Sequence, residues 1–141
     1  MWRSLKNFFY SFWTYADLSP DLRLRRRVNQ TLRKRTNLSA TEWYESYWQP
    51  LEVTRCISDF VYTQMQTYSG LVFGRVRPSD RLNEDLHLFL ICWFDWELSF
   101  CESFLECFGI DLTADFNPDD FVTIKDLVIF LNQQLLLTNH H

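Results

Sequence analysis

The chain has 141 residues, of which 47% are hydrophobic and 18% aromatic; this composition excludes a disordered chain and allows a packed core. With only 3 glycines and 4 prolines, it favours helices over a many-stranded sheet. The net charge of -4 hides a split: the first 36 residues carry nine basic side chains against two acidic ones, and the remainder carries five against sixteen. No apolar run reaches the roughly 18 residues of a membrane span, and no secretory signal is evident, so we expect a cytoplasmic location.

The first 36 residues are predicted to form a basic, aromatic helical extension in front of a domain over residues 37–141. One helix is expected from Trp2 to Tyr15 and a second from Ser19-Pro20-Asp21 to Arg35, with Leu22, Val28 and Leu32 as its apolar stripe. The basic patch of the second helix is Arg25, Arg26, Arg27, Arg33, Lys34 and Arg35. This segment either packs on its own core or a second copy, or lies on an anionic membrane surface, possibilities that we keep open. Contact with nucleic acid is the least favoured.

Two helices are predicted in the middle of the chain. Ser39 and Glu42 form a capping box that begins a short aromatic helix. A longer helix is predicted over residues 53–68, with Gly70 in the left-handed position just beyond its end. The longest loop, residues 71–85, follows.

Two further helices are predicted in the last third of the chain. The first begins at residue 93 or 95, ends at Phe108 and is mostly apolar, as a central helix is. Residues 117–120 indicate a short helical turn, and Thr123 with Asp126 caps the last helix. The four cysteines, which are Cys56, Cys92, Cys101 and Cys107, are expected to be reduced and buried, and their spacing does not indicate a metal site.

The order of motifs in this last part resembles the acyl carrier protein family. Glu84-Asp85-Leu86 ends a long loop, Phe108-Gly109-Ile110-Asp111 closes an amphipathic helix, and Thr123 opens the last one. The resemblance covers residues 53–136 and implies an all-α bundle of three longer helices and one short helix. The chain is also similar to small bacterial carrier-like proteins that lack an assigned role.

The residue on which a carrier depends is missing. A carrier holds phosphopantetheine on a serine at the start of its central helix, and here that position falls on Phe94, followed by Asp95. The resemblance therefore implies a carrier-like protein without a cofactor and without enzyme activity, which acts as a protein–protein interaction or apolar-ligand-binding module. Two alternatives stay open: a carrier that uses Ser99 or Ser103, and a peripheral membrane protein that acts through its basic N-terminal helices.

The resemblance also locates a candidate partner surface. The aromatic run over residues 89–94 stands where a carrier presents its arm, and carriers recruit partners through acids on the next helix. The candidate residues are Phe89, Trp93, Phe94, Trp96, Glu97, Glu102 and Glu106. A protein partner or a second copy of the chain is the expected ligand. The alternatives are core packing for the aromatics and an ordinary solvated helix face for the acids.

Overall fold

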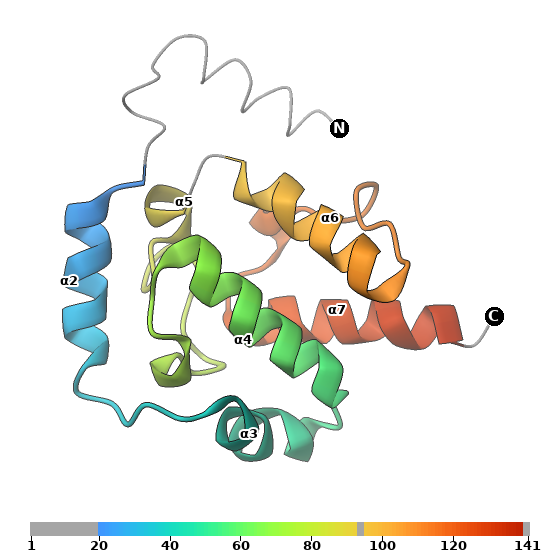
Figure 1. The fold of residues 1–141 in the computed structure, drawn as a ribbon, viewed down its shortest axis with the longest axis horizontal. Coiled ribbons are helices and arrows are strands. Elements are labelled where there is room, and N and C mark those ends of the chain that lie inside the picture. The colour runs from blue at the N-terminus through green and yellow to red at the C-terminus, as the bar shows by residue number, and fades with distance from the viewer. Residues whose placement is uncertain (1–19, 93–94, 140–141) are drawn as a thin grey trace, which may run out of the picture.

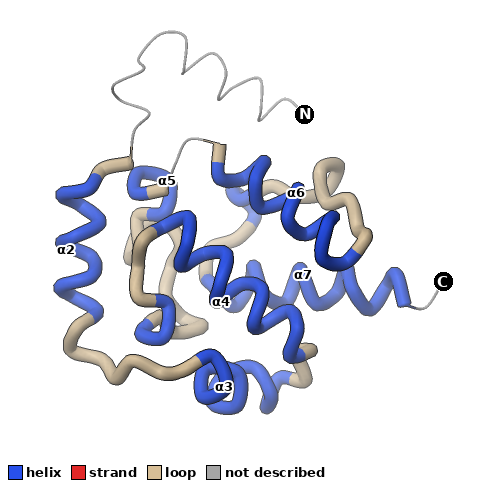
Figure 2. The backbone as a smooth tube through the Cα atoms, in the orientation of Figure 1, coloured by secondary structure: helices blue, strands red, loops and turns tan. Residues whose placement is uncertain are grey.

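Helices form the regular structure of residues 20–92 and 95–139, which are the residues described by the computed structural model (Figure 1). The α-helices are α2 (Leu22–Leu32), α3 (Ala40–Trp43), α4 (Arg55–Ser69), α5 (Leu88–Ile91), α6 (Trp96–Phe108) and α7 (Ile124–Asn139). A π-helix (Tyr44–Trp48) and 3-10 turns (Gln49–Leu51, Phe73–Arg75 and Pro118–Asp120) complete them. No strand forms among these residues (Figure 2), so the predicted all-α class is confirmed. The helix expected from Trp2 to Tyr15 lies outside the described residues.

Aromatic rings join α4 to α6 at the centre of the molecule. Phe60 of α4 lies edge-on to Phe100, Phe104 and Phe108 of α6, with ring centroids 5.3, 5.3 and 5.5 Å apart. The three α6 rings recur every four residues, so they share one face of that helix. Phe100 and Phe104 are fully buried. The mostly apolar α6 therefore lies against the core, as its sequence predicts.

The last helix, α7, packs across α4. Its buried stripe consists of Ile124, Leu127, Val128 and Leu131. Thr123 Oγ1 accepts the amide hydrogen of Asp126 at 3.2 Å, and Asp126 accepts that of Thr123 at 3.1 Å, so the predicted capping box is confirmed. Asn132 accepts the backbone amide of Thr54 at 2.9 Å and ties α7 to the residue before α4.

A second aromatic group holds α3 against the loop that follows α4. Trp43 lies edge-on to Trp48 and Phe73 at 5.3 and 5.9 Å, and its indole nitrogen donates to the Val76 carbonyl at 2.8 Å. The capping box of Ser39 and Glu42 forms as predicted. Because Trp43 and Phe73 are fully buried, the long loop is packed against the core.

The structure corrects the sequence-based boundaries at two places. The helix predicted from Ser19-Pro20-Asp21 to Arg35 spans only Leu22–Leu32, and Asp21 caps it, because its carboxylate accepts the Leu24 amide at 3.0 Å. Leu22 lies outside the predicted apolar stripe, with 59% of its surface exposed. The four-residue helix α5 was not expected. Gly70 ends α4 with φ of 71°, as predicted.

Candidate functional site

Helix α2 is fastened to the bundle through α5 and the end of α4. The Asp21 amide donates to the Leu90 carbonyl at 3.0 Å, and the Arg25 guanidinium donates to the Ile91 carbonyl at 2.7 Å. Asn29 donates to the Gly70 carbonyl and accepts from the Val72 amide, both at 3.0 Å. Val28 and Leu32 are buried in the same core as the rings of α4 and α6. The α2 helix is therefore held flat against the bundle, with its N-terminal end beside α5 (Figure 1).

The charged side chains on the solvent-facing side of α2 are all basic, with the neutral Gln30 among them. The exposed cations are Arg23, Arg26 and Arg27 on α2 and Arg33 and Lys34 directly after its last residue. The predicted basic patch is thus divided, because Arg25 and Arg35 are half-buried and donate to groups of the bundle. No acidic residue occurs from residue 22 to residue 36. The result is a helix face of one charge sign.

Three apolar side chains lie exposed at the N-terminal end of this basic face. Leu22 is 59% exposed, Phe89 65% and Leu90 50%. The Asp21–Leu90 backbone hydrogen bond brings the two segments together. We call these three residues and the five exposed cations on and directly after α2 the α2–α5 surface. Sequence reasoning pointed to Phe89 but missed Leu22 and Leu90, because only the tertiary contact shows that they lie beside each other.

The other aromatics of the predicted partner surface are not gathered there. Trp96 is 6% exposed and packs against Phe100 and Phe116 at 6.2 and 6.5 Å, so it belongs to the core. Trp93 and Phe94 lie outside the described residues.

The acids of α6 form a separate surface. Glu102 and Glu106 are exposed one turn apart, with Leu105 between them at 46% exposure, and Glu97 is half-buried. In Figure 1, α6 and α2 lie on opposite sides of the view. The structure therefore does not bring the predicted acidic and basic residues together.

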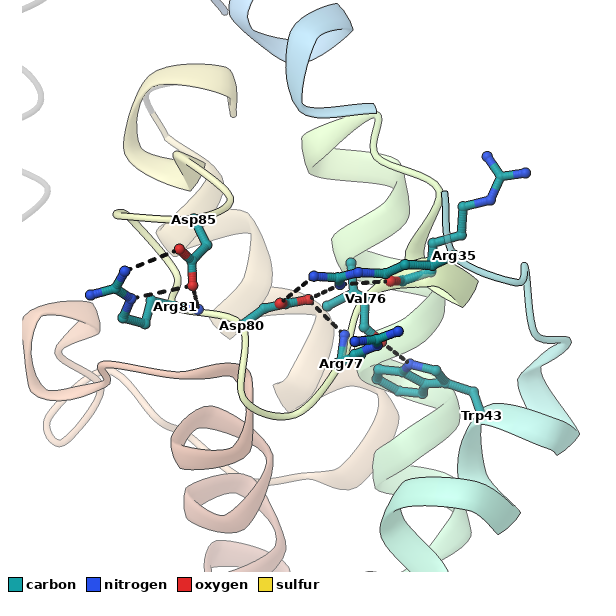
Figure 3. Close-up of polar contacts among 8 residues, drawn as sticks. Arg35, Trp43, Val76, Arg77, Asp80, Arg81 and Asp85 are labelled. Carbon is teal, nitrogen blue, oxygen red and sulfur yellow. Dashed lines mark hydrogen bonds and ion pairs between the residues drawn. The ribbon is translucent and has the colours of Figure 1, made fainter. Parts of the chain in front are cut away.

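An ion pair with a buried carboxylate fixes the C-terminal end of α2 to the long loop. Asp80 is 5% exposed and accepts two hydrogen bonds from Arg35, at 2.6 and 3.0 Å, and a third from the Arg77 amide at 2.7 Å (Figure 3). Arg35 also donates to the Arg75 carbonyl at 3.0 Å. The hydrogen bond to Asp80 is the main cause that raises the pKa of the Arg35 guanidinium, which stays charged. The pair joins residues 45 apart in sequence, for which no local motif exists.

A cavity of about 350 Å³ lies beside this ion pair, between α2 and the loop that precedes α5. It is lined by Leu24, Arg27, Val28, Thr31, Leu32, Arg35, Asp80, Glu84, Asp85, Leu86 and His87. Arg35 and Asp80 are paired with each other, and Glu84 and Asp85 are both paired with Arg81. Four of the charged residues that line the cavity are therefore already engaged in ion pairs.

Two of the four cysteine thiols are buried. Burial raises the pKa of the Cys92 and Cys101 thiols to about 12, which disfavours the thiolate. Cys56 and Cys107 are exposed, which corrects the expectation that all four cysteines are buried; all four are free. Within the described residues, no group of His, Cys, Asp and Glu could hold a metal ion.

The described helices include none with the combined length and apolarity of a bilayer span. Comparison with known proteins gives no further assignment: no family model, no curated protein and no solved structure matches the chain.

Proposed function

We propose that this chain is a non-enzymatic docking module, built on an acyl-carrier-like scaffold that carries no prosthetic group. The order of elements supports the scaffold: a long helix (α4), a long loop, a second long helix (α6), a 3-10 turn at Pro118–Asp120 and a last long helix (α7). The resemblance from the motifs implies the same order. Helix α2 adds a further element that packs on this bundle.

The positions around the start of α6 support the loss of the prosthetic group. Asp95 directly precedes α6, and a carboxylate cannot form the phosphodiester that a serine oxygen forms. Further along, Ser103 lies 3.2 Å from the Tyr68 hydroxyl and shares a hydrogen bond with it. Both Ser99 and Ser103 are half-buried, so neither stands at an open helix start. A long phosphopantetheine arm needs such an opening.

The observation that carries the docking function is the α2–α5 surface. It sets three large exposed apolar side chains, each at least half exposed, beside five exposed cations. Hydrogen bonds from Asp21, Arg25 and Asn29 fix α2 in place, so the surface needs little ordering when it binds. Rigid surfaces that combine apolar residues with arginines are typical of binding sites.

Site-specific photo-crosslinking in the source cells tests this function. A benzoylphenylalanine replaces Gln30, which is exposed among the cations of α2, and in a matched control it replaces Gln133, which is exposed on α7. We expect a covalent adduct of a protein or a lipid at position 30 and little at position 133. Equal yields at the two positions, or an uncrosslinked chain at both, would refute the docking function.

The intact mass of the same protein tests the missing prosthetic group. We expect the mass of the bare chain after co-expression with a phosphopantetheinyl transferase. A phosphopantetheine adduct that disappears in Ser99→Ala or Ser103→Ala would show a working carrier with a non-standard serine, and would overturn the proposal.

A further inference from the structure

We propose that the partner of the α2–α5 surface is an anionic lipid membrane surface, on which the protein lies without crossing it. This inference rests on the proposed docking function and names the partner class of the same surface. Three properties of the surface carry it: a single charge sign on an exposed helix face, exposed apolar residues at one end, and the opposite charge over the rest of the chain.

The exposed face of α2 matches an extended negative plane. Three of the five cations lie on α2, whose 11 residues cover roughly 16 Å at about 1.5 Å per residue, and Arg33 and Lys34 follow directly. The side of α2 that packs on the bundle contributes Val28 and Leu32, while Arg25 and Arg35 donate inward and leave the outward face to the other cations. A row of basic residues on one helix face is attracted to anionic headgroups over about one Debye length, which is about 8 Å at physiological salt.

The exposed apolar residues distinguish a membrane from a nucleic acid. Leu22, Phe89 and Leu90 lie at the end of the basic face, where a bilayer can bury them in the boundary between headgroups and acyl chains. A nucleic acid neutralises cations through phosphates but has no apolar phase for two leucines and a phenylalanine. The pairing of a basic face with an adjoining apolar tip therefore favours lipid.

The charge of the remaining chain sets the orientation. Residues 37–141 carry sixteen acidic side chains against five basic ones, so a negative membrane repels most of the molecule. Among the described residues, the exposed cations are most concentrated on the side that α2 presents, so this side is attracted most strongly. The protein is therefore expected to approach with α2 parallel to the membrane plane and α5 inserted at the interface.

Co-sedimentation of the full chain with vesicles tests the inference. The vesicles are phosphatidylcholine alone, or phosphatidylcholine mixed with phosphatidylserine. We expect binding only to the mixed vesicles, and weakening as salt rises. Because the first nineteen residues also carry basic and aromatic side chains, variants must assign the binding to α2 and α5.

Two pairs of variants make that assignment. Arg26→Gln with Arg33→Gln removes two cations from the α2–α5 surface, and Arg55→Gln with Lys125→Gln removes two exposed cations elsewhere at the same cost in net charge. We expect the first pair to weaken vesicle binding roughly tenfold or more and the second to change it little. All variants are first checked for wild-type circular dichroism.

A separate pair of variants tests the exposed apolar residues of the α2–α5 surface. Phe89→Ser is expected to weaken binding several-fold, whereas Leu137→Ser, at a residue 58% exposed on the far end of α7, is expected to leave it unchanged.

Several outcomes overturn the inference. The first is that the protein does not bind vesicles that contain phosphatidylserine. The second is that a test variant and its control variant lose vesicle binding equally. The third is that duplex DNA binds as tightly as the vesicles and that Phe89→Ser does not weaken the DNA binding. A dimer in sedimentation velocity that dissociates on Arg26→Gln with Arg33→Gln would instead assign the surface to a second copy. If position 30 crosslinks in cells but the protein does not bind the vesicles, the membrane proposal is wrong and the docking function stands. If position 30 does not crosslink, both the docking function and the membrane proposal fail.

Discussion

The buried ion pair between Arg35 and Asp80 predicts a large loss of stability in Asp80→Ala. Asp80 is 5% exposed, and its carboxylate accepts three hydrogen bonds, two of them from the Arg35 guanidinium. Removing one partner of a buried pair leaves the other charge without compensation, which costs about 3–5 kcal/mol when both are fully buried. The Arg35 side chain is 25% exposed, so water screens part of that cost. We therefore expect the free energy of unfolding to fall by about 2–3 kcal/mol.

Urea denaturation at neutral pH measures this loss, and a double-mutant cycle with Arg35→Ala isolates the pair. The matched control is Glu84→Ala, because Glu84 pairs with Arg81 on the surface with 66% of its side chain exposed. That control is expected to unfold at the wild-type midpoint. If Asp80→Ala unfolds within about 0.5 kcal/mol of the wild type, or the coupling to Arg35 is near zero, the ion pair does not hold α2 to the loop as argued.

Two further predictions concern the core and the cysteines. Gly74→Ala is expected to cost about 3 kcal/mol of unfolding free energy, because an added Cβ would overlap the backbone carbonyl of Leu38, which cannot move aside as a flexible side chain can. At Gly109, an added Cβ meets nothing within 4 Å, so Gly109→Ala is expected to cost only about 1 kcal/mol, the cost of its left-handed φ of 71°. Urea midpoints of the two variants compare them, and equal losses would contradict the close approach. In the folded protein at pH 8, a thiol reagent should modify the exposed Cys107 while Cys92, with its pKa of about 12, is modified only after denaturation. Residue-resolved mass spectrometry follows both thiols, and equal rates in the native state would show that burial does not protect Cys92.

Local sequence predicted the longer described helices α2, α4, α6 and α7 and where several of them begin, but not the short α5. The capping boxes at Ser39 and Thr123 and the glycine at position 70 use side-chain and backbone chemistry within four residues, so each was predictable and is confirmed. Periodicity likewise placed Ile124, Leu127 and Val128 on the buried face of the last helix.

Tertiary contacts decided what the sequence left open about the candidate surface. Trp96 and Phe89 are both large aromatics of one segment, yet Trp96 is 6% exposed and Phe89 is 65% exposed. Helix α5 buries Leu88 and Ile91 and leaves Phe89 and Leu90 on its outer side, whereas Trp96 lies on the side of α6 that faces the core. Spacing alone cannot distinguish an aromatic residue that fills a core from one that binds a partner.

The basic residues also show what the sequence alone determines and what the tertiary structure decides. The sequence by itself determined a strongly basic segment before an acidic domain. Helical spacing already places Arg25 and Arg35 on the side of Val28 and Leu32, because these four positions recur at intervals of three and four residues. Only the folded chain supplied their acceptors, the Ile91 carbonyl and the Asp80 carboxylate, which lie 66 and 45 residues away in sequence. Because a buried cation needs such an acceptor, the tertiary contacts decided that these two arginines turn inward and that Arg23, Arg26 and Arg27 stay exposed.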